Sequence, residues 1–210
     1  MMPSLSVAIS LIALGVSVIT AWLTFFRRGR LVMTQPTLVF FGPDGPQFIG
    51  KNKIYLRTLI YCTAKRGIVI ESLHVTVQRN ESKQNFNIWV YGDNGDLKRG
   101  SGIFVPQEGI TFDHHFLQPA DGSNFKFKAG AYRLTVLAKL VGEETPKELM
   151  TIKLSISESQ ELALSSPQTA IFFDWGPDQQ NYHPHIRNGM DIDSDMKKLI
   201  ESFDKIKGKG

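Results

Sequence analysis

The chain has 210 residues and a formal net charge of +4, from 24 basic and 20 acidic residues. Without Arg27, Arg28 and Arg30, 21 basic residues stand against 20 acidic ones, so no basic surface of the kind that binds nucleic acid is indicated. Cys62 is the single cysteine, which excludes an internal disulfide, and its apolar surroundings are typical of a core residue.

Residues 7–26 are uncharged and mostly apolar. A helix of this length is about 30 Å long, which is the thickness of the hydrocarbon core of a bilayer. The leader, residues 1–6, has no charged side chain, and the apolar segment ends in Trp22, Phe25 and Phe26 instead of small residues, unlike a cleavable signal peptide. The sequence therefore predicts a transmembrane helix over residues 7–26.

Arg27, Arg28 and Arg30 follow the apolar segment in a basic juxtamembrane linker at residues 27–35, and no Lys or Arg precedes the segment. Basic flanks stay on the cytoplasmic side of a membrane. We therefore expect a single-pass protein of the plasma or inner membrane whose C-terminal domain lies in the cytoplasm. The alternative, a periplasmic or extracellular domain, stays open.

Small or weakly polar residues recur along the apolar segment at alternating steps of four and three. They form one seam on the predicted helix: Ser6, Ser10, Ala13, Ser17, Thr20 and Thr24. Small residues let helices approach closely in lipid, so the seam predicts pairing with a second copy or with another membrane protein. In the alternative interpretation the hydroxyls bond only to carbonyls of their own helix.

Residues 36–157 consist of short apolar or alternating segments separated by turn residues. The segments are residues 37–41, 54–63, 69–77, 85–91, 102–105, 110–117, 131–140 and 148–156. Their lengths and spacing, without helical patterns between them, predict a mainly β fold, an antiparallel β-sandwich.

Gly130, Ala131 and Tyr132 begin the segment at 131–140, and Leu134 and Val136 continue its alternation. This sequence resembles the penultimate strand of immunoglobulin-like and fibronectin-like domains, in which such a tyrosine often makes a tyrosine corner. The resemblance implies an immunoglobulin-like sandwich over residues 36–157 and no particular activity. The paired cysteines of antibody domains are absent, and Trp89 is the candidate core indole.

After the sandwich we expect a loop-rich extension at residues 158–190 and an amphipathic helix at residues 191–210. Ser157 and Gln160 have the spacing of a capping box, which predicts a short helix that ends near Leu164. Large apolar side chains of the extension and the terminal helix are candidate partner contacts. They are Phe172, Phe173, Trp175, Leu199 and Phe203.

His183 and His185 are the candidate metal ligands, because two imidazoles lie two residues apart in a segment with several acidic residues. A zinc site needs three or four converging ligands, so a distant side chain would have to join them. Trp89 and Tyr91 at a strand end have the composition of a sugar-binding platform. No complete nucleotide-binding, calcium-binding or hydrolase motif occurs, and no cofactor is expected.

These patterns favour a non-catalytic, membrane-anchored scaffold protein that presents a β-sandwich to partners at the membrane. Its partners would be membrane lipid and another membrane protein or a second copy of the chain. The alternative is a membrane-anchored metal-dependent hydrolase, or a protein that binds a small ligand such as a sugar, through the loop of His183 and His185.

Overall fold

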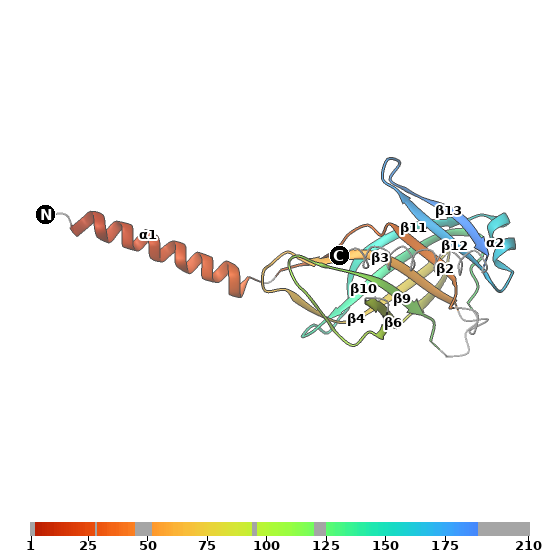
Figure 1. Cartoon of the computed structure of the whole chain (residues 1–210), viewed down its shortest axis with the longest axis horizontal. Coiled ribbons are helices and arrows are strands. Elements are labelled where there is room, and N and C mark those ends of the chain that lie inside the picture. The colour runs from red at the N-terminus through yellow and green to blue at the C-terminus, as the bar shows by residue number, and fades with distance from the viewer. Residues whose placement is uncertain (1–2, 28, 45–51, 94–95, 120–124, 189–210) are drawn as a thin grey trace, which may run out of the picture.

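The computed structural model describes residues 3–27, 29–44, 52–93, 96–119 and 125–188. Figure 1 shows a long N-terminal helix that leads into a β-rich domain. The helix consists of α1 (Pro3–Ala21) and a π-helical turn, η1 (Trp22–Phe26), in which the N–H of Arg27 donates to the carbonyl of Trp22 over 3.0 Å. It begins before the predicted residue 7, because proline is tolerated in the first turn of a helix.

The stretch Leu5–Phe26 has a mean hydropathy of 2.1, and none of it is buried against the domain. It is therefore long and apolar enough to span a membrane.

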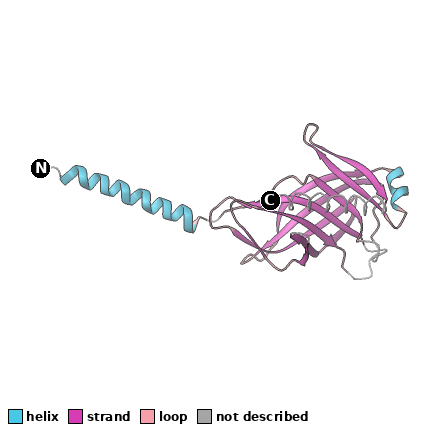
Figure 2. Ribbon diagram, viewed as in Figure 1, coloured by secondary structure: helices cyan, strands magenta, loops and turns pink. Residues whose placement is uncertain are grey.

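The described strands form two antiparallel sheets (Figure 2). The eight-stranded sheet contains β1 (Leu31–Met33), β2 (Leu38–Pro43), β3 (Asn52–Cys62), β6 (Ile88–Asp93), β7 (Asp96–Arg99), β9 (Ile110–Leu117), β12 (Thr169–Gly176) and β13 (Asn181–Asn188). The five-stranded sheet contains β4 (Ile68–Arg79), β5 (Ser82–Phe86), β8 (Ile103–Val105), β10 (Gly130–Leu140) and β11 (Lys147–Ile156). The predicted mainly β, sandwich architecture is confirmed, whereas the predicted helix at residues 191–210 lies outside the described residues.

In the larger sheet the strands run in the order β13-β12-β2-β3-β9-β6-β7, and β1 pairs with the end of β3 beyond β2. In the smaller sheet the order is β11-β10-β4-β5, and β8 pairs with the start of β4. Alternate residues of each long strand are buried, as in β3 and β10. Because side chains alternate across a strand, one face of each sheet supplies the core between them.

The tyrosine corner forms as the resemblance implied. The Tyr132 hydroxyl donates to the carbonyl of Lys128 over 2.6 Å and accepts from the N–H of the same residue over 2.8 Å. Its ring is buried in the core and contacts Phe41 edge-on at 6.0 Å between centroids. The hydroxyl thus satisfies two backbone groups of the loop that enters β10.

The predicted loop-rich extension at residues 158–190 is wrong beyond its first helix. That helix, α2 (Glu158–Leu164), forms with the expected capping box of Ser157 and Gln160. Strands β12 and β13 then make a hairpin that extends the larger sheet, because β12 pairs with β2. The polar composition and Pro184 of β13 resemble a loop, but proline is tolerated in an edge strand, where its missing N–H faces outward.

Two further boundaries differ from the prediction. The linker at residues 27–35 contains β1, so the chain joins the sheet soon after the helix ends. The predicted strand at residues 85–91 is two strands, β5 and β6, which belong to different sheets. The chain changes sheets between Phe86 and Ile88, and the inward-facing residue of β6 is therefore Trp89.

Candidate functional site at the helix end of the sandwich

Arg30 fixes the chain to the sandwich four residues after the helix ends. Its N–H donates to the Thr63 hydroxyl over 2.8 Å, and the N–H of Thr63 donates to the carbonyl of Arg30 over 3.0 Å. Gly29 lies against buried Cys62, because a Cβ at this glycine would come within 2.5 Å of the cysteine sulfur. The spacer between helix and domain is therefore short and closely packed at its end.

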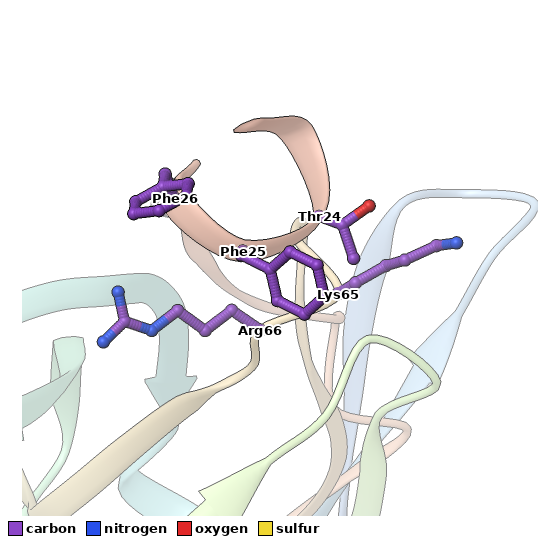
Figure 3. Close-up of a pocket in the computed structure, with 5 residues that line it drawn as sticks. All are labelled: Thr24, Phe25, Phe26, Lys65 and Arg66. Atoms are coloured by element: carbon purple, nitrogen blue, oxygen red, sulfur yellow. The ribbon is translucent and has the colours of Figure 1, made fainter. Parts of the chain in front are cut away.

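An open cleft lies between the last helical turn and the β3–β4 loop (Figure 3). Thr24, Phe25 and Phe26 line it from the helix, and Lys65 and Arg66 line it from the loop. Figure 3 shows the two basic side chains extending in opposite directions below the helix end. Cations of the folded domain thus lie beside the last apolar residues of the candidate membrane span.

Arg27 and Arg30 are exposed on the same end of the domain, and Arg28 lies outside the described residues. The helix with its basic flank is consistent with a membrane span or a signal anchor. The side of the membrane on which the sandwich lies stays a prediction from the position of these arginines.

The residues of the predicted seam from Ser6 to Thr24 lie on an exposed helix. The hydroxyl of Ser10 donates to the carbonyl of Ser6 over 2.9 Å, and that of Ser17 donates to the carbonyl of Ala13 over 2.8 Å. Two hydroxyls of the seam are thus satisfied within their own helix, as in the alternative interpretation. Pairing of this helix with another helix through the seam would then depend on the close packing of the two helix backbones.

The two hairpin histidines point to the same face of β13, two residues apart. His185 Nδ1 lies 3.1 Å from Asp174 Oδ2, and His183 is the cross-strand partner of Asp174. Among the described residues, no group of three or more His, Cys, Asp and Glu side chains is arranged to hold a metal ion. Within this part of the chain, Asp174 is the acidic neighbour of both histidines.

A row of aromatic side chains crosses the outer face of the larger sheet from β13 to β9. Cross-strand pairing aligns His185, Phe172, Phe40, Tyr55 and His115. Phe172 stacks on His185 at 5.4 Å and meets Phe40 edge-on at 5.0 Å, while Tyr55 and His115 lie 5.0 Å apart. Aromatic pairs of this geometry stabilise a sheet face, and we name this feature the aromatic row.

Charged groups flank the aromatic row. The Tyr55 hydroxyl donates to Asp113 Oδ1 over 2.8 Å, and burial, followed by the Asp113 charge, raises the pKa of Tyr55. Burial and the neighbouring Lys53 lower the pKa of His115 to about 4, although Asp113 opposes this shift. Tyr55 and His115 are therefore neutral near pH 7, and an acid and a base border this part of the row.

The candidate partner contacts fall into three groups. Phe172 is half-buried in the aromatic row, and Trp175 is half-buried against Tyr182 at 5.0 Å. Phe173 is 1% exposed and belongs to the core, since it faces Phe41 from the other side of β12, so it is unavailable to a partner. Leu199 and Phe203 lie outside the described residues.

Trp89 and His114 form a buried polar pair in the core. The indole N–H of Trp89 donates to His114 Nδ1 over 3.2 Å, and Nε2 of this histidine has no hydrogen-bond partner among the described residues. Burial, and then the charge of His115, lowers the pKa of His114 to about 4. Trp89 is 3% exposed, which rules out the predicted sugar platform at this residue.

Alternation along β9 puts His114 on the same face as Phe112 and Phe116, but it cannot identify the indole as its partner, because Trp89 comes from another strand. The aromatic row was likewise missed. Its members are scattered over the sequence and meet only through strand order.

No protein-family model matches the sequence, and no curated protein matches it. Among solved structures, the chain is similar to the CooA pilin subunit from enterotoxigenic Escherichia coli, with 10% identity, a TM-score of 0.27, and coverage of 58% of this chain and 99% of the pilin. It is also similar to ACE19, the collagen-binding subdomain of the Enterococcus faecalis surface protein ACE, with 8% identity, a TM-score of 0.22, and coverage of 59% and 99%. Such TM-scores support no inference about function, so the function must be argued from the chain itself.

Proposed function

We propose that the chain is a single-pass, membrane-anchored, non-catalytic binding protein whose sandwich meets a partner held at the same membrane. The observation that supports this most strongly is the stretch Leu5–Phe26, whose apolar side chains are not buried by the sandwich. An apolar surface of this size is unstable in water and stable in lipid. Tethering would raise the effective concentration of a partner in the same membrane and make weak contacts productive.

The aromatic row supports a role in binding. Aromatic side chains are enriched where proteins bind each other, because they bury a large area with few rotatable bonds. Phe172 is the second member of the row, on β12 between β13 and β2, and Arg187 lies 5.1 Å from its ring. We assign partner contact to this outer face of the larger sheet.

Extraction of membranes with alkaline carbonate tests the anchor. The wild-type chain should remain in the pellet, and so should Leu11→Ala/Leu14→Ala, which keeps the helix apolar. Leu11→Asp/Leu14→Asp should be released, since each charge near the centre of a span costs about 3 kcal/mol. Release of the wild-type chain would refute the anchor.

Protease protection of sealed cells tests the orientation. With the sandwich in the cytoplasm, external protease should leave it intact until the membrane is opened. Digestion in intact cells would place the domain outside and contradict the assignment from Arg27, Arg28 and Arg30.

A photoreactive phenylalanine analogue at position 172 tests the partner face in intact membranes. We expect a specific adduct there and none at position 162, which is exposed on α2. Equal labelling at both positions would argue against the aromatic row as a binding surface.

Leucine substitutions at Ser10, Ala13 and Ser17 test the seam in the same membranes, because bulky residues should abolish lateral adducts of the helix.

A further inference from the structure

Exposed apolar side chains gather at the helix end of the smaller sheet. Val69, Phe104 and Val141 are 41%, 56% and 61% exposed. Val69 and Phe104 are direct cross-strand partners on β4 and β8, so they share the outer face, and the N–H of Val141 donates to the carbonyl of Val69 over 3.1 Å. We name these three residues the apolar cluster.

The apolar cluster is continuous with the basic β3–β4 loop. Gly67 ends this loop with a φ of +69°, and the ring of Phe104 lies directly over it, where a Cβ would clash. Lys65 and Arg66 precede this glycine, are exposed, and line the cleft beneath Phe25 and Phe26. Apolar and cationic side chains thus form one surface beside the end of the helix.

The short spacer limits how far this surface can move from the end of a membrane span. Arg30, which bonds to Thr63, is four positions after Phe26, so the extended reach of the spacer is at most about 14 Å. The headgroup layer on each side of a bilayer is about 6 Å thick. Val69 lies only two residues beyond Gly67 along β4, about 7 Å. The loop and the apolar cluster therefore remain within reach of the headgroups.

The charges at this end favour anionic lipid. Arg27, Arg30, Lys65 and Arg66 are exposed, whereas the acidic residues of the neighbouring loops are fewer. They are Glu108, Glu143 and Glu144, and Glu143 is paired with Lys147 at 2.6 Å. Basic residues at an anionic bilayer surface each favour the bound state about fivefold.

We infer that the helix end of the sandwich, formed by Lys65, Arg66 and the apolar cluster, docks onto the headgroup layer of the bilayer that holds the helix. This inference rests on the proposed membrane anchor. The docked cluster lies on the outer face of the smaller sheet, and the aromatic row lies on the outer face of the larger one. Because the two sheets pack face to face, docking orients the sandwich with its aromatic row turned away from the lipid.

The test uses the full-length chain in vesicles of phosphatidylcholine with about one third phosphatidylglycerol, a composition with a negative surface. A fluorophore on Thr145→Cys, in the exposed β10–β11 loop beside Val141, reports contact with nitroxide-labelled headgroups. The same fluorophore on Ser159→Cys, in α2 at the opposite end of the sandwich, is the matched control (Figure 1). Native Cys62 is buried and does not compete for the label.

Headgroup quenching should be several-fold stronger at position 145 than at position 159. Phe104→Ser and Val141→Ser should each weaken it, and the second variant leaves the contact with Gly67 intact. Lys65→Gln/Arg66→Gln should weaken it in anionic vesicles and have little effect in pure phosphatidylcholine. Leu162→Ser, at an apolar residue of α2 that is more exposed than Phe104 or Val141, should leave the quenching unchanged.

Two results would overturn the docking while leaving the anchor intact. One is a chain that resists carbonate extraction but shows equal quenching at both positions. The other is strong quenching at position 145 that none of the variants reduces, because proximity would then come from the spacer alone. Loss of the chain from carbonate-washed vesicles would instead refute the anchor.

Discussion

His114 should make the sandwich sensitive to mild acid, and His114→Gln should remove about half of this sensitivity, because the pKa of neighbouring His115 is lowered to a similar value. The folded domain holds the imidazole neutral, because burial lowers its pKa from 6.5 to about 4 and its Nδ1 already accepts the Trp89 indole N–H. A proton on Nδ1 would break that hydrogen bond and place a charge in the core. Glutamine keeps an acceptor for the indole but does not titrate.

The pKa values set the direction and the size of the effect. As the pH falls below 6.5 the unfolded chain binds a proton that the folded chain excludes, so stability is full above pH 6.5 and decreases toward pH 4. A pKa difference of this size contributes about 3 kcal/mol to the free energy of unfolding. About 2 kcal/mol of this contribution is lost between pH 7 and pH 5. With a urea dependence of about 2 kcal/mol per molar, the contribution of His114 to the shift of the unfolding midpoint should be about 1 M.

The assay is urea unfolding of the full-length chain in mild detergent, followed by tryptophan emission, to which Trp89 and Trp175 contribute from the sandwich and Trp22 from the helix. His115 contributes in the same direction, so the decisive quantity is the difference in pH dependence between wild type and His114→Gln. His183→Gln, in the exposed hairpin, is the control and should retain the wild-type dependence. An identical midpoint shift in His114→Gln would refute the burial of a neutral imidazole at this position.

Three other predictions follow from the packing. Tyr132→Phe should lower the free energy of unfolding by about 1–2 kcal/mol, because two backbone hydrogen bonds at Lys128 lose their partner; thermal melting measures this loss. Phe173→Ala should lower the free energy of unfolding by about 3–5 kcal/mol, and Phe172→Ala should lower it by less than half as much. Equal losses of stability in urea unfolding would contradict the assignment of these two neighbours to opposite faces of β12. Cys62 should not react with a maleimide until denaturant is added. Rapid labelling of the native chain would show that the segment at Gly29 does not shield the Cys62 thiol from solvent.

Local patterns in the sequence were sufficient where neighbouring residues decide the structure. The apolar length of residues 7–26 predicted the helix, and the capping box at Ser157 predicted α2, because both depend on contacts within a few residues. The Gly-x-Tyr sequence predicted the tyrosine corner, in which Tyr132 bonds to a residue four positions earlier. Alternation likewise predicted β9 over residues 110–117.

Local sequence patterns could not predict features that depend on pairing between strands far apart in the sequence. Strand β13 has polar residues and a proline, and it forms a strand because it pairs with the free edge of β12. The chain between Phe86 and Ile88 changes sheets, which continuous alternation cannot reveal.

The sequence by itself determined an apolar N-terminal helix with a basic flank and a β-rich domain, since residue type, period and charge are properties of short stretches. Only the tertiary structure decided which strands adjoin, and with them the aromatic row, the pairing of Trp89 with His114, and the meeting of Phe104 with the Lys65–Arg66 loop. The physical reason is that side chains from distant strands become neighbours through the order and register of the strands in the sheets. The residues of a single strand do not specify which strands pair with it.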